Sequence, residues 1–171
     1  MPNPIQSMIQ DNVNEHGLAI QFVFPTQEHP GPSFAYTIGM TDIGQPELLM
    51  FGLPHNLAGM VFNQIHAQIK AGSMTGEEDT IDELLSVPLL VHSADDTQAA
   101  QYTVQCHQYY LGTEKKPVFK QLLWPDTNGV YPHQVGYEEK FKEIQPYVCL
   151  DRNPTAEQNK APGGEPDSFD L

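Results

Sequence analysis

The first part of the chain lacks positive charge. Residues 1–69 contain neither lysine nor arginine, and Arg152 is the only arginine of the protein. The chain has 8 Lys+Arg against 22 Asp+Glu, so its formal net charge is −14 over 171 residues. Nucleic acids and anionic membranes attract clustered cations, so we expect neither as a partner. A protein of this charge could instead act as an acidic mimic that binds a basic protein partner.

Cysteine and long apolar runs are also scarce. Cys106 and Cys149 are the only cysteines, and they form neither a Cys-x-x-Cys motif nor a framework of disulfides. No run approaches the roughly 18 apolar residues of a membrane span, and the N-terminal segment lacks the basic and apolar regions of a secretory signal. These absences predict a reduced, soluble, cytoplasmic protein.

Two apolar segments bounded by glycine and proline dominate what is present. Residues 34–40 read Phe-Ala-Tyr-Thr-Ile-Gly-Met, and residues 46–54 read Pro-Glu-Leu-Leu-Met-Phe-Gly-Leu-Pro. This composition predicts neighbouring strands, and the lack of polar alternation indicates that both faces are covered. Further strands are expected at 18–24, 88–93 and 118–124.

Helical periodicity is clearest between His55 and Gly72, where apolar residues recur every four positions and Asn56 can cap the start. Shorter helical patterns cover residues 5–16 and 95–112. Within the latter, the alternation of Tyr102, Val104 and Cys106 also fits a strand. The capping-box spacing of Thr75-Gly-Glu-Glu predicts one more brief helix within residues 73–86.

These elements predict a single α+β domain over residues 1–150, with one long helix and two shorter helices around an antiparallel or mixed sheet. A small closed, split-barrel-like core is the alternative arrangement of the strands. Residues 151–171 are rich in Pro, Gly, Asp, Glu and Asn and hold few apolar residues. They are expected to form a disordered acidic tail.

Three residues are candidates for acid/base chemistry: Glu47, His55 and His133. Glu47 begins a strand that is expected to be buried, where a carboxylate is costly unless it is paired or lies at the end of the sheet. It could serve as a general base beside His55. A surface charge at the strand end is the alternative interpretation.

A second set of residues could line a small-molecule cleft. The hydroxyl groups of Tyr36 and Thr37 lie among apolar residues, where they either point into a pocket or make hydrogen bonds inside the sheet. Trp124, Asp126 and His133 flank one turn, where they could line the cleft or pin a loop, and Asp126 could cap its own turn. The predicted ligand-binding set is Tyr36, Thr37, His55, Trp124, Asp126 and His133.

Metal and phosphate motifs are not found. The seven histidines show no two-ligand spacing, so only histidines distant in sequence could meet at a metal, and no metal site is predicted. The segment from Glu77 to Asp96 holds seven acids without the pattern of a calcium loop. No Gly-rich phosphate loop and no Gly-x-Ser-x-Gly elbow occur. The cofactor, if there is one, is unknown from the sequence.

Three motifs carry a family resemblance. They are Pro32-x-Phe-Ala-Tyr-Thr-Ile-Gly39, the segment from Pro46 to Pro54, and Leu123-Trp-Pro-Asp126 followed by Gly129 and Tyr131-Pro132. Over roughly residues 15–137 the chain resembles the bacterial "domain of unknown function 4262" family. The resemblance implies one small α+β domain without assigned chemistry. Related members often carry Trp where this chain has His133.

A looser similarity connects the strand, strand and helix order to split-barrel flavin-binding proteins. Those proteins hold the flavin phosphate with basic groups, which this region lacks. The favoured function is a non-enzymatic module that binds a small molecule or a protein. The alternatives are a flavin- or metal-dependent oxidoreductase, a small hydrolase, and the acidic mimic. The oligomeric state remains open.

Overall fold

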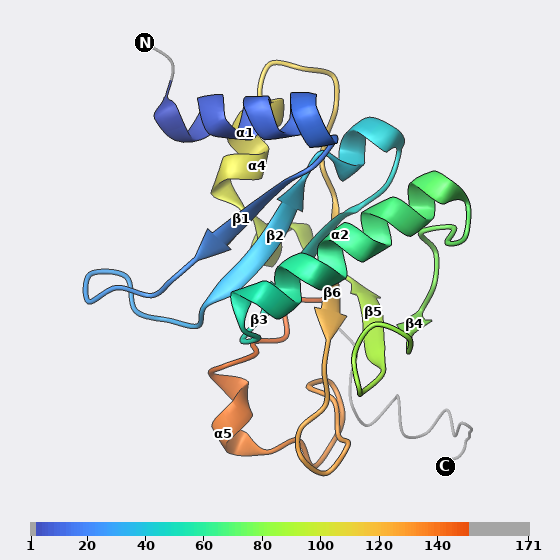
Figure 1. The fold of residues 1–171 in the computed structure, drawn as a ribbon. Helices are drawn as coiled ribbons and strands as arrows, with labels where there is room; N and C mark the ends of the chain where they lie inside the picture. The colour runs from blue at the N-terminus through green and yellow to red at the C-terminus, as the bar shows by residue number, and fades with distance from the viewer. Residues whose placement is uncertain (1–2, 151–171) are drawn as a thin grey trace.

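The computed structural model describes residues 3–150, and the predicted tail at 151–171 lies outside this range. The described chain forms one mixed six-stranded sheet with helices on both faces (Figure 1). Its strands are β1 (Ala19–Val23), β2 (Phe34–Ile38), β3 (Glu47–Phe51), β4 (Thr80–Ile81), β5 (Leu89–Ser93) and β6 (Phe119–Leu123). The expected strands are thereby confirmed, and β4 is an addition to them.

The strand order is β1-β2-β3-β6-β5-β4. Neighbouring strands are antiparallel except for β3 and β6, which run parallel. The sheet therefore ends at β1 on one side and at β4 on the other. It is not closed, so the split-barrel-like alternative is wrong, while the α+β class with a mixed sheet is confirmed.

Five α-helices and one 3-10 helix surround the sheet within the described residues. They are α1 (Pro4–His16), η1 (Met40–Ile43), α2 (His55–Ala71), α3 (Asp96–Ala100), α4 (Val104–Tyr110) and α5 (Glu139–Lys142). Helix α2 covers one face of the sheet, and α1 and α4 cover the other (Figure 1). None of these helices has the length and apolar content needed to cross a membrane.

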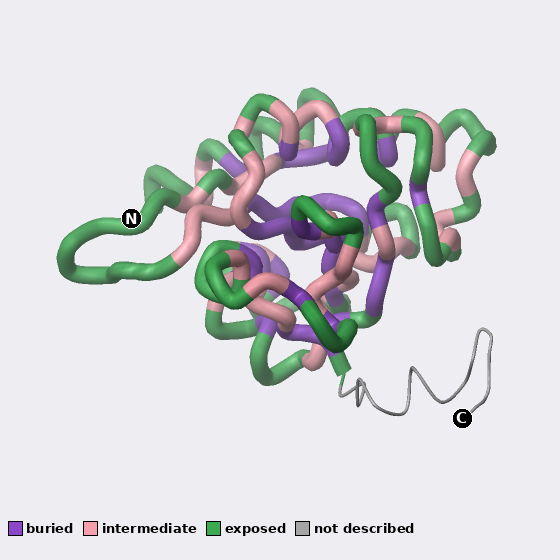
Figure 2. Tube along the Cα trace, turned by 90° about the horizontal axis from the view of Figure 1, so that it is seen from below, coloured by how far each residue is buried: buried purple, intermediate pink, exposed green. Residues whose placement is uncertain are grey.

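The core consists of two apolar layers, one on each face of the sheet. Tyr36 and Ile38 belong to the layer under α1 and α4, whereas Ala35 belongs to the layer under α2. This alternation follows from the two-residue repeat of a strand. Figure 2 shows the buried centre of the sheet enclosed by more exposed segments. Both faces are covered, as the lack of polar alternation predicts.

The helix expected over residues 95–112 is two helices, α3 and α4, and the strand alternative is also wrong. Thr103 separates the two helices with non-helical dihedral angles of φ −111° and ψ 41°. Its side-chain oxygen donates a hydrogen bond of 2.9 Å to the carbonyl of Ala99. Such a bond from a threonine hydroxyl competes with the regular helical pattern.

The brief helix expected within residues 73–86 does not form. The carboxylate of Glu78 accepts hydrogen bonds of 2.9 Å from the backbone N–H groups of both Thr75 and Gly76, which closes a turn instead. Strand β4 follows this turn. The expected cap at Asn56 is also wrong, because Pro54 is the N-cap of α2 and makes no side-chain hydrogen bond.

Gly39 lies where the end of β2 passes very close to the start of β1. Its φ angle is +126°, and a Cβ atom at this position would lie 2.6 Å from the carbonyl oxygen of Gly17. A side chain therefore meets both an unfavourable backbone conformation and a backbone atom that has little freedom to move.

We expect Gly39→Ala to lower the free energy of unfolding by roughly 2–4 kcal/mol, because it adds strain and an overlap. Gly44→Ala is the matched control. Gly44 also has a positive φ of 75°, but its added Cβ would meet no atom within 4 Å. The control should lose only about 1–2 kcal/mol in urea denaturation. Equal losses in the two variants would contradict the proposed close contact.

Candidate functional site

Glu47, the first residue of β3, is fully buried, with 0% of its surface exposed. Its Oε1 accepts hydrogen bonds from Thr37 Oγ1 at 2.7 Å and from the N–H of Met40 at 3.1 Å. Its Oε2 accepts from the N–H groups of Gly39 at 3.1 Å and Thr41 at 2.9 Å, and from Thr41 Oγ1 at 2.6 Å. The carboxylate thus closes the connection between β2 and β3.

The local sequence produces this arrangement where β2 and β3 diverge. Thr37 Oγ1 accepts a hydrogen bond of 2.9 Å from the N–H of Leu48. In a regular sheet, a backbone carbonyl of the neighbouring strand would accept this bond. Its own proton is then directed at Glu47. The turn that starts at Gly39 points three consecutive N–H groups at the same carboxylate. Thr37 and Glu47 are therefore one hydrogen-bonded unit.

The environment of Glu47 is governed by its burial. Burial raises the pKa of Glu47, and the hydrogen bonds from Thr41, Thr37 and Gly39 lower it in part. No ion pair with Glu47 occurs among residues 3–150. Since the carboxyl group is enclosed on all sides, the geometry favours a role in holding the fold over contact with a substrate. The expected surface charge is not observed either.

One further contact links Glu47 to the surface. The hydroxyl group of Tyr110 lies 3.5 Å from Glu47 Oε2, at the limit of a hydrogen bond. Burial raises the pKa of Tyr110, and the charges of Glu47 and Asp42 raise it further. Tyr110 stays a neutral phenol at physiological pH. Tyr110 is also one of the residues that line a groove on the outside of the molecule.

This groove lies between the helices α3 and α4 and the segment 111–118, and its volume is about 760 Å³. Much of its wall is apolar, contributed by Ala100, Leu111, Pro117 and Val118. The lining residues with polar groups are Asp96, Thr97, His107, Tyr110, Thr113, Lys115 and Lys116. A concave site that combines an apolar wall with polar groups is typical of small-molecule binding.

His107 is the polar side chain of most interest in the groove wall. Its Nε2 atom is buried and has no hydrogen-bond partner in the described part of the chain. Burial lowers the pKa of His107, and the nearby charge of Asp96 raises it in part. The imidazole is therefore neutral near pH 7. A buried nitrogen without a partner is costly to the stability of the fold.

Two lysines lie side by side in the segment that borders the groove. Lys115 Nζ forms an ion pair of 2.6 Å with Asp42. Lys116 forms no ion pair with any residue in 3–150. Its charge is therefore available to a ligand at the rim of the groove.

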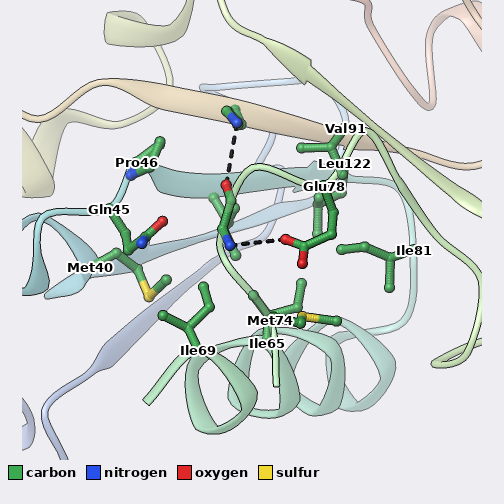
Figure 3. Close-up of a pocket in the computed structure, with 13 residues that line it drawn as sticks. Met40, Gln45, Pro46, Ile65, Ile69, Met74, Glu78, Ile81, Val91 and Leu122 are labelled. Carbon is green, nitrogen blue, oxygen red and sulfur yellow. Dashed lines mark hydrogen bonds between the residues drawn. The ribbon is translucent and has the colours of Figure 1, made fainter. Parts of the chain in front are cut away.

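A second hollow, between α2 and the sheet, is too small for a ligand. Figure 3 shows its apolar wall, which includes Met40, Ile65 and Met74. Gly76 and Lys120 also line this hollow, and the backbone carbonyl of Gly76 accepts a hydrogen bond of 3.4 Å from Lys120 Nζ. The interior offers about 20 Å³, which is room for about one water molecule. This crevice is a gap in the core packing.

Tyr36 and Trp124, two of the residues predicted from the sequence, make structural hydrogen bonds at separate places. Tyr36 lies in the layer under α1 and α4, and its hydroxyl oxygen accepts from the N–H of Gln105 at 3.2 Å. Trp124 packs in the layer under α2, and its Nε1–H donates to the carbonyl of Phe51 at 2.7 Å. The structure does not bring these two side chains together on one face.

Asp126 caps its own turn, which is one of the two roles considered from the sequence. Its Oδ1 accepts from the N–H groups of Asn128 at 2.8 Å and Val130 at 2.9 Å, and its Oδ2 accepts from that of Glu138 at 3.0 Å. Partial desolvation alone would raise the pKa of Asp126, but these hydrogen bonds outweigh it and lower the pKa. The carboxylate therefore stabilises the loop after β6.

His55 lies at the start of α2 between two aromatic rings. Its ring centroid is 4.8 Å from that of Phe22 and 4.2 Å from that of Phe24. Both imidazole nitrogens are buried without a hydrogen-bond partner in the described chain, and burial lowers the pKa of His55. His55 thus forms part of an aromatic cluster at the end of β1.

His133 meets a histidine that is distant in sequence. Its ring centroid lies 4.6 Å from that of His92 and 5.8 Å from that of Tyr147. The hydroxyl oxygen of Tyr147 is 2.9 Å from His92 Nδ1. Even so, no group of three or more His, Cys, Asp or Glu side chains among the described residues could hold a metal ion.

The predicted ligand-binding set is thus spread over several clusters, and its role in binding stays a prediction. The groove residues His107, Tyr110 and Lys116 were not among the sequence candidates. The lysine doublet at 115 and 116 was the one available signal, because it is the only pair of adjacent cations in the chain.

The family model described as "Domain of unknown function (DUF4262)" matches residues 12–138. The chain belongs to the DUF4262 family. The match confirms the resemblance inferred from the three motifs, and it spans both Glu47 and the groove. Comparisons with curated proteins and with solved structures find no match. The description of the family specifies no chemistry, so the function must be argued from the geometry.

Thr37→Val tests the hydrogen-bonded unit around Glu47. Valine has a similar shape, but it leaves the N–H of Leu48 without a partner and removes one of the two hydrogen bonds to Glu47 Oε1. We expect the free energy of unfolding to fall by roughly 2–4 kcal/mol, as measured by urea denaturation. The control is Thr80→Val on β4, an exposed site where a change of at most about 0.5 kcal/mol is expected. A loss in Thr37→Val as small as in the control would refute the role of this hydroxyl.

Buried histidines should make the fold sensitive to mild acid. Burial lowers the pKa values of His55, His66 and His107, and the charge of Lys70 lowers that of His66 further. The unfolded chain takes up these protons near pH 6.5, whereas the folded chain takes them up only at lower pH. The free energy of unfolding should therefore decrease as pH falls below about 6.5, until the folded state is protonated too.

The measurement is urea denaturation at about pH 7.5 and about pH 5.5, on either side of the unfolded-state pKa. His66→Leu should lose less stability between the two pH values than the unmodified protein does. His29→Gln, in an exposed loop, should lose as much as the unmodified protein. If His66→Leu keeps the full pH dependence, His66 does not contribute to it.

Proposed function

We propose that this DUF4262 protein is a non-enzymatic binding module that holds a small anionic molecule with an apolar body in the groove beside α4. The observation that carries the proposal is the groove itself, whose apolar wall lies beside Lys116, a lysine without an ion-pair partner among residues 3–150. A ligand with an anionic group could bind this lysine, and its apolar body could lie against the wall.

The size of the groove supports a small molecule as the ligand. Its volume of about 760 Å³ falls within the range of roughly 300–1,000 Å³ that ligand pockets occupy. The apolar wall would cover the body of the molecule. Tyr110, which also lines the groove, is held in place by the contact between its hydroxyl group and Glu47.

The charge of the rim supports an anion. Lys115 and Lys116 border the groove, while Asp96 is its only acidic lining residue among those described. Lys116 has no competing ion pair there, so it would bind a carboxylate or phosphate directly. Two adjacent lysines at one site stand out in a chain whose overall charge is −14.

The enzymatic alternatives gain no specific support. Glu47, His55 and His133 contact different partners, and Glu47 is enclosed. Neither a hydrolase nor a flavin- or metal-dependent oxidoreductase is favoured by an observed arrangement of these residues. The thiol of Cys106 is also unsuited to nucleophilic chemistry, because burial raises its pKa.

The test compares 1-naphthoate with 1-naphthamide, which has a similar shape but no charge. Isothermal titration calorimetry of the full chain should show binding of the carboxylate and a weaker interaction with the amide. Lys116→Gln should weaken naphthoate binding about tenfold, since one charge-assisted contact is lost. Lys142→Gln, whose lysine pairs with Glu139 on α5, should bind like the unmodified protein.

His107→Phe separates the imidazole from the lysines, because phenylalanine keeps the ring but supplies no nitrogen. It should weaken naphthoate binding while the protein stays folded by circular dichroism. Equal binding of the carboxylate and the amide, or equal affinities of Lys116→Gln and Lys142→Gln, would overturn the proposed site.

A further inference from the structure

Within residues 3–150, strand β1 forms one edge of the sheet, with β2 as its only neighbour. Helix α1 and helix α2 contact it from the two faces. No hydrogen bond from outside the sheet reaches Ile20 or Phe22 among the described residues. The outer edge of β1 is therefore a row of backbone donors and acceptors without a strand beside it.

The register of the sheet shows which residues present these groups. The N–H of Gly52 donates to the carbonyl of Ser33 at 2.9 Å, so the odd-numbered residues of β2 direct their backbone groups to β3. The even-numbered residues of β2 then face β1, where Tyr36 is paired with Gln21. Along β1, the N–H and C=O groups of Ile20 and Phe22 consequently point away from the sheet.

Exposed aromatic residues lie at the end of this free edge. Phe24 is 67% exposed and Phe22 is 40% exposed. The imidazole of His55 packs against both rings and holds them next to the start of α2. The loop that follows, residues 24–33, projects from the body of the molecule (Figures 1 and 2). Neighbouring exposed aromatic side chains are typical of surfaces that bind a partner.

The charge around β1 indicates the kind of partner. Asp11 and Glu15 on α1 and Glu28 in the loop are exposed acids. Among the elements that contact β1, the only cation is Lys70, in the last turn of α2. A second copy of the chain would bring the same negative surface and no cation from its first 69 residues. A strand with positive side chains complements this edge, and a second copy does not.

We propose that the edge of β1 and its aromatic patch, Phe22 and Phe24, bind an extended, Lys/Arg-bearing segment of another protein as an added strand. The backbone of Ile20 and Phe22 would pair with the segment, and the two aromatic rings would contact its apolar side chains. The surrounding acids would attract its cations. This surface is distinct from the groove, which lies beside α4 and is lined by lysines.

The experiment uses the full chain and a synthetic probe, acetyl-(Lys-Val)₄-amide, which alternates charged and apolar residues. The matched peptide has proline in place of its two central valines, so it keeps the charge but cannot form a strand. Hydrogen exchange measured by mass spectrometry should show slower exchange at residues 19–24 with the first peptide. The proline peptide should leave this exchange unchanged.

Two variants of the protein complete the test. Phe22→Pro removes the N–H group that points away from the sheet, together with the aromatic ring, and it leaves the pairing with β2 in place. Phe24→Ser removes only an exposed ring. Each should weaken binding of the first peptide about tenfold or more. Val135→Ser, which removes another exposed apolar side chain, 57% exposed, should bind normally.

Three outcomes would overturn the proposal. Equal binding of the two peptides would show that charge alone is responsible. Unchanged affinity in Phe24→Ser, which does not disturb the strand, would exclude the aromatic patch. Sedimentation of the protein alone as a dimer, with residues 19–24 already protected from exchange, would make a second copy the occupant of the edge.

Discussion

The structure depends most on the burial of one carboxylate, that of Glu47. A buried carboxylate without partners costs far more than a domain of this size can tolerate, and the hydrogen bonds from residues 37–41 compensate for that burial. The N–H of Glu47 itself donates to the carbonyl of Val118 at 2.8 Å. The same residue therefore joins the turn after β2 to the start of β6, and with it positions one wall of the groove.

Because Glu47 contacts residues of the groove wall, the structure of the groove and that of the core cannot change independently. Tyr110 lines the groove, and its hydroxyl group approaches Glu47. Val118 borders the same groove and accepts the hydrogen bond from Glu47. A change that moves the Glu47 carboxylate would thus move two parts of the groove wall, although neither part is adjacent to Glu47 in sequence.

The fold could be predicted where its signals were local. The strands at 34–38 and 47–51 and the helix α2 follow from composition and periodicity within each segment. The prediction of one continuous helix over 95–112 was wrong because the backbone of Thr103 leaves the helical conformation, with φ −111° and ψ 41°. Periodicity does not encode such a break. The prediction of a closed core was wrong for another reason. Whether β1 and β4 meet depends on the order of the strands in the sheet.

The candidate site was harder to predict, because its residues become neighbours only through the sheet. Thr37 and Glu47 were each singled out, but their direct contact depends on the register of β2 and β3. His107 has no distinguishing sequence context, since its place beside the groove comes from the fold. Among the groove residues, Lys115 and Lys116 alone form a distinctive sequence feature, as the one pair of adjacent cations in the chain.

The distribution of charge matters more for binding than its sum. A net charge of −14 would suggest that the whole surface repels anions. Screening limits such long-range effects to about 8 Å at physiological ionic strength, so a ligand in the groove responds mainly to the nearby lysines. The elements that contact β1 carry one lysine, Lys70, so a strand that paired with this edge would meet few cations there. The two proposed surfaces therefore differ in charge although they belong to one acidic chain.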